Sequence, residues 1–133
     1  MLKKKPLIFD AGCGTGVNHI FLQQYGKVVS LDLSADALAF CRKRNLTRLV
    51  LGDLNKSNFK INSFDMIVAL DVIYHSWIED DNSLLREFFR ILKPGGKLLI
   101  TDSALPFLFS QHDIAVMTRE RYTLRGLKIK LSK

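Results

Sequence analysis

The sequence predicts an α/β fold in which helices cover both faces of a doubly wound, mostly parallel sheet. Short apolar runs with strand character alternate with segments of helical character along most of the chain. One of these runs, Phe64–Leu70, is almost continuously apolar, which is typical of a strand that is covered on both faces. At this length we expect a single domain, residues 1–133.

The individual elements follow from local patterns and from residues that end helices. The expected strands are Pro6–Asp10, Lys27–Asp32, Arg48–Asp53, Phe64–Leu70 and Lys97–Asp102. The expected helices are Thr15–Tyr25, Ala35–Asn45 and Asp80–Lys93. In the last helix Leu84, Phe88 and Leu92 recur every four residues. Leu85 and Phe89 extend this row into one broad apolar face.

The most informative stretch is the glycine-rich turn that follows the first strand. Asp10 ends the strand, and Gly12, Gly14 and Gly16 then alternate with other residues. Glycines let a ligand lie directly on the main chain, and the helix that follows offers free N–H groups to an anion. A dinucleotide-binding turn has the pattern G-x-G-x-x-G/A, and its last position falls here on Val17. The spacing therefore disfavours an NAD-dependent enzyme.

Acidic residues stand at or just after the carboxyl end of every expected strand. They are Asp10, Asp32, Asp53, Asp71 and Asp102. Ligands of doubly wound sheets bind beyond these strand ends, at the point where the strand order reverses. The sequence therefore predicts a polar cleft along one edge of the sheet.

Residues 6–102 resemble the class I S-adenosylmethionine (SAM)-dependent methyltransferases. The resemblance rests on Asp10 with Gly12, Gly14 and Gly16, on Asp32, and on Gly52-Asp53-Leu54, which occur in the family's order and spacing. The segments 64–75 and 89–98 are similar to the later strands, loop and turn. It is nearest to small-molecule methyltransferases of the quinone-biosynthesis type. It implies the strand order 3-2-1-4-5, here with reduced C-terminal strands.

The resemblance also implies SAM as the cofactor and assigns residues to it. They are Asp10, Gly12, Cys13, Gly14, Gly16, Asp32, Leu33, Asp53, Leu54 and Leu70. In this assignment Asp32 accepts hydrogen bonds from the ribose hydroxyls, and Asp53 accepts one from the adenine amino group. Asp10 lies near the ammonium group of the cofactor, and Leu33 packs against the adenine. Cys13 is expected to be a small tolerated residue.

On the acceptor side, His75 is the candidate general base because it follows the fourth strand on the expected cleft. Tyr74 and Trp77 either line an aromatic acceptor pocket or pack against the next helix. His112 is a weaker candidate, and His19 is expected to be solvated. Two cysteines form no metal-ligand cluster, so no metal site is expected.

The chain departs from the resembled family at both ends. Strand structure begins within six residues of Met1, and the alternation in Leu127–Leu131 predicts at most one extra edge strand. Three alternatives follow: a truncated methyltransferase, a minimal domain whose free sheet edge pairs in a homodimer, or a non-catalytic SAM-binding or interaction module.

The charge distribution raises one further alternative. The net charge is +7, and most of the excess lies in residues 119–133. A solvated terminus is the favoured interpretation, and an RNA methyltransferase that uses this basic tail is the alternative. Nucleic acid is therefore an unlikely partner. The apolar runs are too short for a membrane span or signal peptide, and a cytoplasmic location is expected.

Overall fold

The computed structural model describes residues 4–75, 77–102 and 122–132, and it confirms the predicted fold class. Five parallel strands form one sheet in the order β3-β2-β1-β4-β5. The strands are β1 (Leu7–Ala11), β2 (Lys27–Asp32), β3 (Leu49–Leu51), β4 (Phe64–Leu70) and β5 (Leu92–Thr101). The helices are α1 (Val17–Leu22), α2 (Ala35–Lys43), the 3₁₀-helix η1 (Leu54–Lys56), α3 (Asp81–Ile91) and α5 (Leu124–Leu131).

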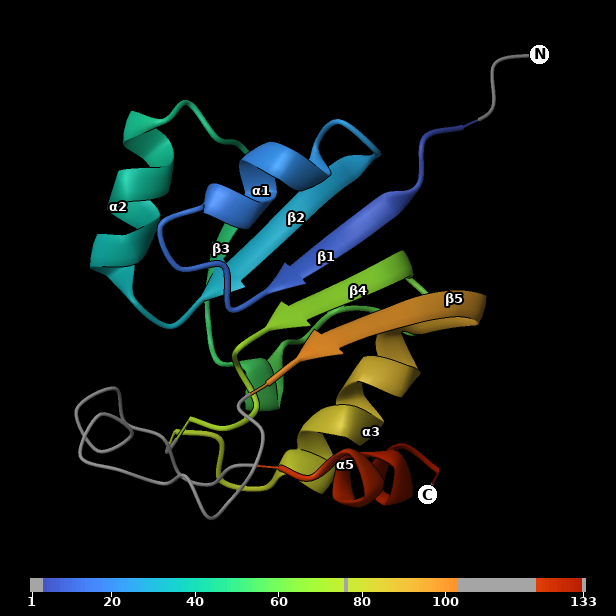
Figure 1. Ribbon diagram of the computed structural model, residues 1–133. Helices are drawn as coiled ribbons and strands as arrows, with labels where there is room; N and C mark the ends of the chain where they lie inside the picture. Colours follow the sequence, from blue (N-terminus) through green and yellow to red (C-terminus); the bar gives the residue numbers. More distant parts are fainter. Residues whose placement is uncertain (1–3, 76, 103–121, 133) are drawn as a thin grey trace.

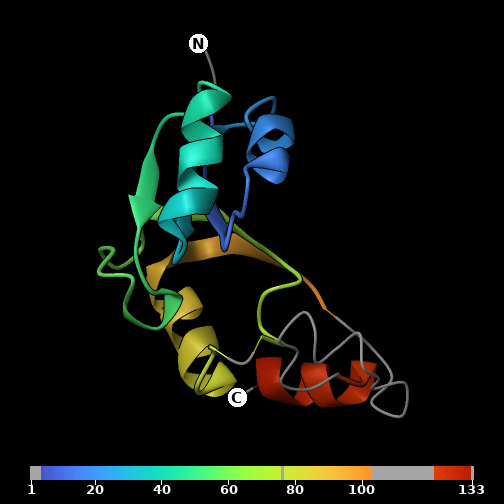
Figure 2. The ribbon, with the colours of Figure 1, turned by 90° about the vertical axis from the view of Figure 1, so that its left-hand side faces the viewer.

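The helices lie in two layers on either side of the sheet (Figure 1). Turned by 90°, the molecule shows α1 and α2 on one side, and α3 and α5 on the other (Figure 2). β1 is the central strand, because Asp10 stands in register with Ser30 of β2 and with Val68 of β4. The order of the strands reverses between β1 and β4, and a crevice is expected beyond the carboxyl ends of these two strands.

An aromatic cluster fills the core between the sheet and α3. The ring centroid of Phe9 lies 5.0 Å from that of Phe64 and 5.0 Å from that of Phe59. Phe88 of α3 completes the cluster and is fully buried. The apolar face of α3 is narrower than predicted, because the side chain of Phe89 is 50% exposed.

The element boundaries that differ most from the sequence-based prediction are those of α1 and β5. α1 begins at Val17, because Gly16 takes the N-cap position in the left-handed conformation, and it ends already at Leu22. At the other end of the sheet, β5 begins at Leu92, which pairs with Phe64 before the predicted turn at Lys93–Gly96. A register shift follows, and pairing resumes between Met66 and Lys97.

The predicted extra edge strand is wrong, because Leu127–Leu131 belongs to α5. The side-chain oxygen of Thr123 accepts a hydrogen bond from the Gly126 N–H and caps this helix. The alternation of apolar residues in this segment is too short to distinguish a strand from a helix.

A buried carboxylate anchors α5 to the rest of the molecule. Asp81, in the first turn of α3, is 3% exposed. Its carboxylate oxygens lie 2.7 Å from the Tyr122 hydroxyl and 2.9 Å from Lys130 Nζ. The Tyr122 hydroxyl also lies 3.3 Å from the carbonyl oxygen of Ile73, which belongs to the loop after β4. Tyr122 and Lys130 therefore attach the C-terminal segment both to α3 and to this loop.

Several predictions are not decided by the described residues. The apolar stretch Leu105–Phe109 and His112 lie outside them, as do Arg119, Arg121 and Lys133 of the basic tail. β5 pairs only with β4 among the described strands, and pairing of this edge with a second copy stays a prediction. Within the described ranges, no helix combines the length and the apolar character that crossing a membrane requires.

Replacing Lys130 by Met tests the anchor. The change removes the Lys130 ammonium from the buried Asp81 carboxylate, so we expect the free energy of unfolding to fall by about 2 kcal/mol. Urea denaturation measures this change. Lys128→Met is the matched control, because Lys128 lies exposed on the same helix. Equal losses in the two variants would mean that the ion pair contributes nothing specific.

Candidate functional site

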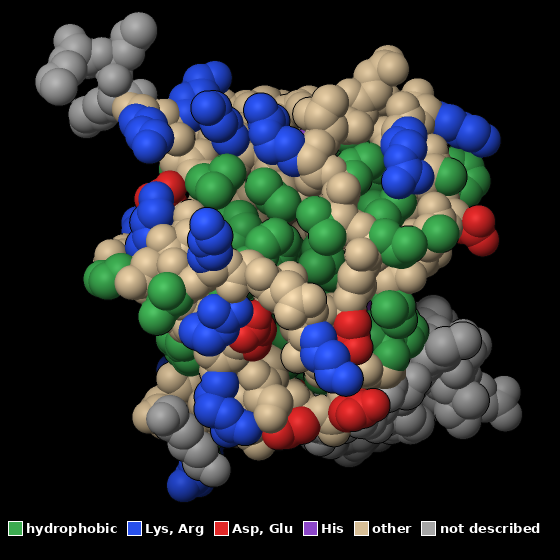
Figure 3. All heavy atoms as spheres, turned by 180° about the vertical axis from the view of Figure 1, so that it is seen from behind, with side chains coloured by type: hydrophobic (Ala, Val, Ile, Leu, Met, Phe, Trp, Pro, Cys, Tyr) green, Lys and Arg blue, Asp and Glu red, His purple; other side chains and the backbone are tan. Residues whose placement is uncertain are grey.

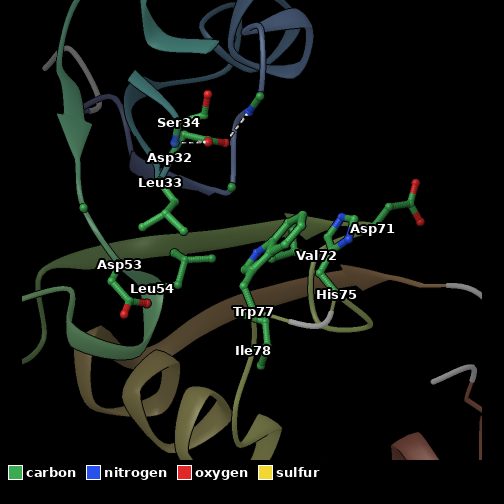
Figure 4. Close-up of a pocket in the computed structure, with 13 residues that line it drawn as sticks. Asp32, Leu33, Ser34, Asp53, Leu54, Asp71, Val72, His75, Trp77 and Ile78 are labelled. Atoms are coloured by element: carbon green, nitrogen blue, oxygen red, sulfur yellow. Dashed lines mark hydrogen bonds between the residues drawn. The ribbon is translucent and has the colours of Figure 1, made fainter. Parts of the chain in front are cut away.

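A pocket of about 460 Å³ opens beyond the carboxyl ends of the strands. The glycine turn, the β2–α2 connection, the segment after β3 and the loop after β4 all contribute to its lining. This is the crevice expected where the strand order reverses. Figure 4 shows Leu33 and Leu54 on one side of the pocket, and His75 and Trp77 on the other.

The glycine turn is held by hydrogen bonds to the neighbouring strand. The N–H groups of Gly12 and Cys13 both donate to the carbonyl oxygen of Leu31, at 2.9 and 3.1 Å. Gly14 and Gly16 have φ angles of +53° and +85°, which residues with a Cβ atom rarely adopt. The main chain therefore forms the surface of the pocket at Gly14, which lines it.

The carboxylate of Asp32 connects the two segments that frame this side of the pocket. One oxygen accepts a hydrogen bond from the Gly14 N–H at 2.8 Å, and the other accepts from the Ser34 N–H at 2.9 Å. Dashed lines mark both bonds in Figure 4. A carboxylate has about four acceptor positions, so each oxygen retains capacity for a ligand hydroxyl.

The structure brings together most of the residues that the sequence assigned to a cofactor. Those that line the pocket are Gly12, Gly14, Asp32, Leu33, Asp53 and Leu54, together with the predicted base His75. Asp53 also caps η1, because one of its carboxylate oxygens accepts a hydrogen bond from the Asn55 N–H. The role of each residue toward a cofactor stays a prediction.

Four predicted cofactor residues do not line the pocket. Asp10 and Cys13 are buried behind the turn. A Cβ on Gly16 would lie 2.5 Å from Leu46 Cδ1, so this glycine faces the packing against α2. Leu70 packs against the apolar cluster that includes Leu22 and Val68. Its side chain points to the face of the sheet that α1 covers. Val68, two residues earlier in β4, points to the same face, because successive residues of a strand alternate between faces.

Both cysteine thiols are buried against the turn. Cys13 Sγ and Cys41 Sγ lie 3.6 and 3.3 Å from the Gly14 carbonyl oxygen, to which they donate. Burial raises the pKa of both thiols above the ordinary value for cysteine. Thiolate chemistry is therefore disfavoured at both positions. The expected packing role of Cys13 agrees with this geometry.

A chain of three buried polar side chains runs beneath the glycine turn. His19 Nδ1 lies 2.7 Å from Ser30 Oγ, and Ser30 Oγ lies 3.3 Å from Asp10 Oδ2. His19 was predicted to be solvated, and this is wrong, because it is 2% exposed. Burial lowers the pKa of His19, with Arg48 adding to the effect, and it raises the pKa of Asp10 to about 6.

Three aromatic rings stand together at the acceptor side of the pocket. The His75 ring stacks on Trp77, with 3.9 Å between centroids and 17° between planes. The centroid of the Tyr74 ring lies 4.2 Å from that of His75, with the two rings tilted by 39°. Trp77 lines the pocket and is 42% exposed, whereas Tyr74 packs against the core. Of the two aromatic residues considered for an acceptor pocket, the geometry selects Trp77.

Sequence reasoning missed two apolar walls of the pocket. Val72 and Ile78 line it, and both are buried. Their signal was weak because both lie in a short irregular loop, where hydrophobic periodicity gives no information. The remaining lining residues outside the cofactor assignment are Ser34, Gly52 and Asp71.

The charges of the described pocket lining are negative. Asp32, Asp53 and Asp71 line it, and among the described residues no lysine or arginine does. Asp102 follows β5 but is not part of the lining. Because these carboxylates line it, the pocket favours neutral or cationic groups over anions.

On the face seen from behind, Lys and Arg side chains are spread around a band of hydrophobic side chains rather than gathered in one patch (Figure 3).

Comparison with known proteins identifies related sequences and folds. Residues 9–100 match the family described as "Methyltransferase domain". Phosphoethanolamine N-methyltransferase 3 of Arabidopsis thaliana is 32% identical over 130 residues, which cover 91% of this chain and 26% of that protein. Demethylmenaquinone methyltransferase of Oceanobacillus iheyensis is 31% identical over 109 residues, covering 74% of this chain and 45% of that protein.

A solved structure extends this likeness to the fold. Phosphoethanolamine N-methyltransferase 2 of Haemonchus contortus, in complex with S-adenosyl-L-methionine, superposes with a TM-score of 0.78 and 28% identity. The alignment covers 99% of this chain and 33% of that structure. The chain thus spans 26% of the length of the Arabidopsis relative and a similar share of the other plant relatives.

Alanine substitutions at two glycines separate packing from pocket shape. Gly16→Ala forces a strained φ and places a Cβ against Leu46 and Cys41, so we expect a loss of 2 kcal/mol or more, about the cost of strain plus overpacking. At Gly14 a Cβ meets nothing within 4 Å, so Gly14→Ala should lose only about 1 kcal/mol. Urea denaturation compares the two variants. Similar losses at both positions would contradict the described packing of the turn.

Proposed function

The chain belongs to the methyltransferase domain family, and on this premise we propose that it transfers a methyl group from SAM to a small-molecule acceptor. The observation that carries the proposal is the pocket, in which the glycine turn, the acid that ends β2 and the acid after β3 meet at one edge of the sheet. The family resemblance of the sequence assigns these three features to one cofactor.

The residues of the pocket fit SAM chemically. Asp32 keeps acceptor capacity on both oxygens for a vicinal diol, although each oxygen already accepts one main-chain N–H. Leu33 and Leu54 offer apolar surface to a planar base. The open space at Gly14 admits a ligand directly against the main chain. The volume of about 460 Å³ is in the range of small-molecule sites.

The cofactor, when bound, supplies a methyl group on a sulfonium that is already a good leaving group. The chain's own residues then have three tasks: to bind, to orient and to exclude water. Val72 and Ile78 form buried apolar walls, which keep water from that part of the pocket. Asp10 lies directly before the glycine turn, and its carboxylate is proposed to compensate the positive charge of the methionine portion.

We assign the proton transfer on the acceptor side to His75. Its ring lines the pocket, stacks on Trp77 and contacts the Tyr74 ring, and these contacts restrict its orientation. A neutral imidazole accepts a proton from an acceptor amine or hydroxyl as the new bond to carbon forms. Trp77 offers an aromatic face to the acceptor beside this base.

An amine is the acceptor that we favour. Asp53 and Asp71 make the described lining negative, and the face of Trp77 attracts cationic groups. The N-methyltransferase names of the Arabidopsis and Haemonchus relatives agree with this choice. A quinone-type acceptor, which the sequence resemblance suggested, remains the comparison compound in the experiment below.

Calorimetric titration with S-adenosylhomocysteine tests the cofactor site. We expect the natural chain to bind it and Asp32→Ala to bind at least tenfold more weakly, because the substitution removes the acceptor of the ribose hydroxyls. Asp36→Ala is the matched control: it removes the same charge from an exposed position in the first turn of α2. Equal affinities of all three proteins would refute the proposed role of Asp32.

Transfer of a labelled methyl group from SAM tests the reaction. We expect methylation of a small amine without an anionic group, such as ethanolamine, and not of a demethylmenaquinone analogue. His75→Ala should lower kcat by about 10²-fold or more while S-adenosylhomocysteine affinity stays within a factor of three. Glu79→Gln, an exposed change in the same loop, serves as the control. Binding without transfer to any acceptor would instead favour a non-catalytic SAM-binding module.

A further inference from the structure

His19 and Ser30 have no role in the mechanism described so far, and Asp10, to which they are linked by hydrogen bonds, enters it only through its charge. The three side chains come from α1, β2 and β1, and their exposed fractions are 2%, 0% and 1%. Burial of so many titratable and polar groups is costly unless they bond to one another, and the distances of 2.7 and 3.3 Å supply these bonds. This series of hydrogen-bonded side chains ends at Asp10, two residues before Gly12.

The chemistry of a single hydroxyl fixes how these bonds are oriented. Ser30 has one O–H hydrogen, so it donates either to Asp10 or to His19. When Asp10 is a carboxylate, the Ser30 hydroxyl donates to it, and Ser30 Oγ then accepts from a protonated His19 Nδ1. When Asp10 is a carboxylic acid, it donates to Ser30 Oγ, and the Ser30 hydroxyl turns to an unprotonated Nδ1.

The two arrangements differ by one proton. In the acid form the neutral imidazole carries its hydrogen on Nε2. In the carboxylate form it carries its hydrogen on Nδ1, and the proton from Nε2 has left. The bond between His19 and Ser30 and the bond between Ser30 and Asp10 are made in both arrangements, so the charge of Asp10 changes without breaking either of them.

We propose that Ser30 and His19 are positioning residues that hold the Asp10 carboxylate ionised beneath the glycine turn, and that they couple cofactor binding to the release of one proton. The inference rests on the proposed function, because the ligand it concerns is SAM or S-adenosylhomocysteine, both of which carry an ammonium group. A cation close to the turn stabilises the carboxylate arrangement over the acid arrangement.

Few other charged or titratable groups near Asp10 and His19 influence the ionisation of Asp10. Asp32 on β2 and the thiols of Cys13 and Cys41 face Asp10, and Arg48, before β3, faces His19. Burial raises the pKa of both thiols, so they stay protonated around neutral pH. Asp32 opposes ionisation of Asp10, which makes the hydrogen bond from Ser30 the main contact that favours its carboxylate form.

Titration of S-adenosylhomocysteine into the full chain at several pH values tests the inference. Heats measured in buffers of different ionisation enthalpy give the number of protons released. We expect close to one proton below pH 6, where Asp10 starts protonated, and close to none at pH 8. Affinity should rise with pH over the same interval.

Substitutions of Ser30 and His19 test whether these side chains cause the pH dependence of binding. At pH 8, Ser30→Ala and His19→Leu should each weaken binding about tenfold, since each removes a bond that supports the carboxylate. Ser30→Thr keeps the hydroxyl and His19→Gln keeps an N–H donor, so both should bind within a factor of three of the natural chain. Gln24→Ala, exposed just after α1, is the control for changes in this region.

The tautomer of His19 gives a readout that needs no ligand and no variant. Nitrogen NMR of the natural chain at pH 8 should find the hydrogen on Nδ1. Hydrogen on Nε2 at that pH would overturn the inference, as would Ser30→Ala binding as tightly as the natural chain at every pH. If the natural chain binds no S-adenosylhomocysteine at all, the proposed function fails and this inference fails with it. Binding by a natural chain that carries the hydrogen on Nε2 at pH 8 overturns the inference alone.

Discussion

The Asp32 carboxylate makes the contact on which the candidate site depends. Its two oxygens accept the N–H groups of Gly14 and Ser34, and they thereby hold the glycine turn against the connection between β2 and α2. Parallel pairing of β1 with β2 brings these segments to the same edge of the sheet. The bonds fix the turn before any ligand arrives, which reduces the ordering that binding would otherwise require.

Much of this arrangement could be predicted because each strand carries its own signal. The acids and glycines can be located in the sequence because they come directly after the predicted strands. Parallel pairing of these strands then brings them to the same edge of the sheet. The burial of His19 could not be predicted, since its partner Ser30 lies eleven residues away on another element. The helix over 124–131 depends likewise on the contact between Lys130 and Asp81, which are 49 residues apart.

The pocket has two sides of different origin. The cofactor side is built from regular strand ends and a main-chain turn, and such features recur within a fold. The proposed acceptor side is the loop after β4, in which the rings of Tyr74, His75 and Trp77 contact one another. Tyr122 holds this loop through the Ile73 carbonyl oxygen. Residues far along the chain therefore influence the orientation of the candidate base.

The buried Asp10 also has a consequence for the stability of the unliganded protein. Its pKa is about 6 when folded and 3.8 in the ordinary, solvated state, so between these values the folded chain binds more protons than the unfolded chain. The free energy of unfolding therefore falls as the pH rises from about 4 to 6, at most by roughly 3 kcal/mol. At neutral pH the buried charge of Asp10 therefore lowers the stability of the unliganded protein. Selection for stability alone would remove this acid, and its presence fits selection for a bound cation.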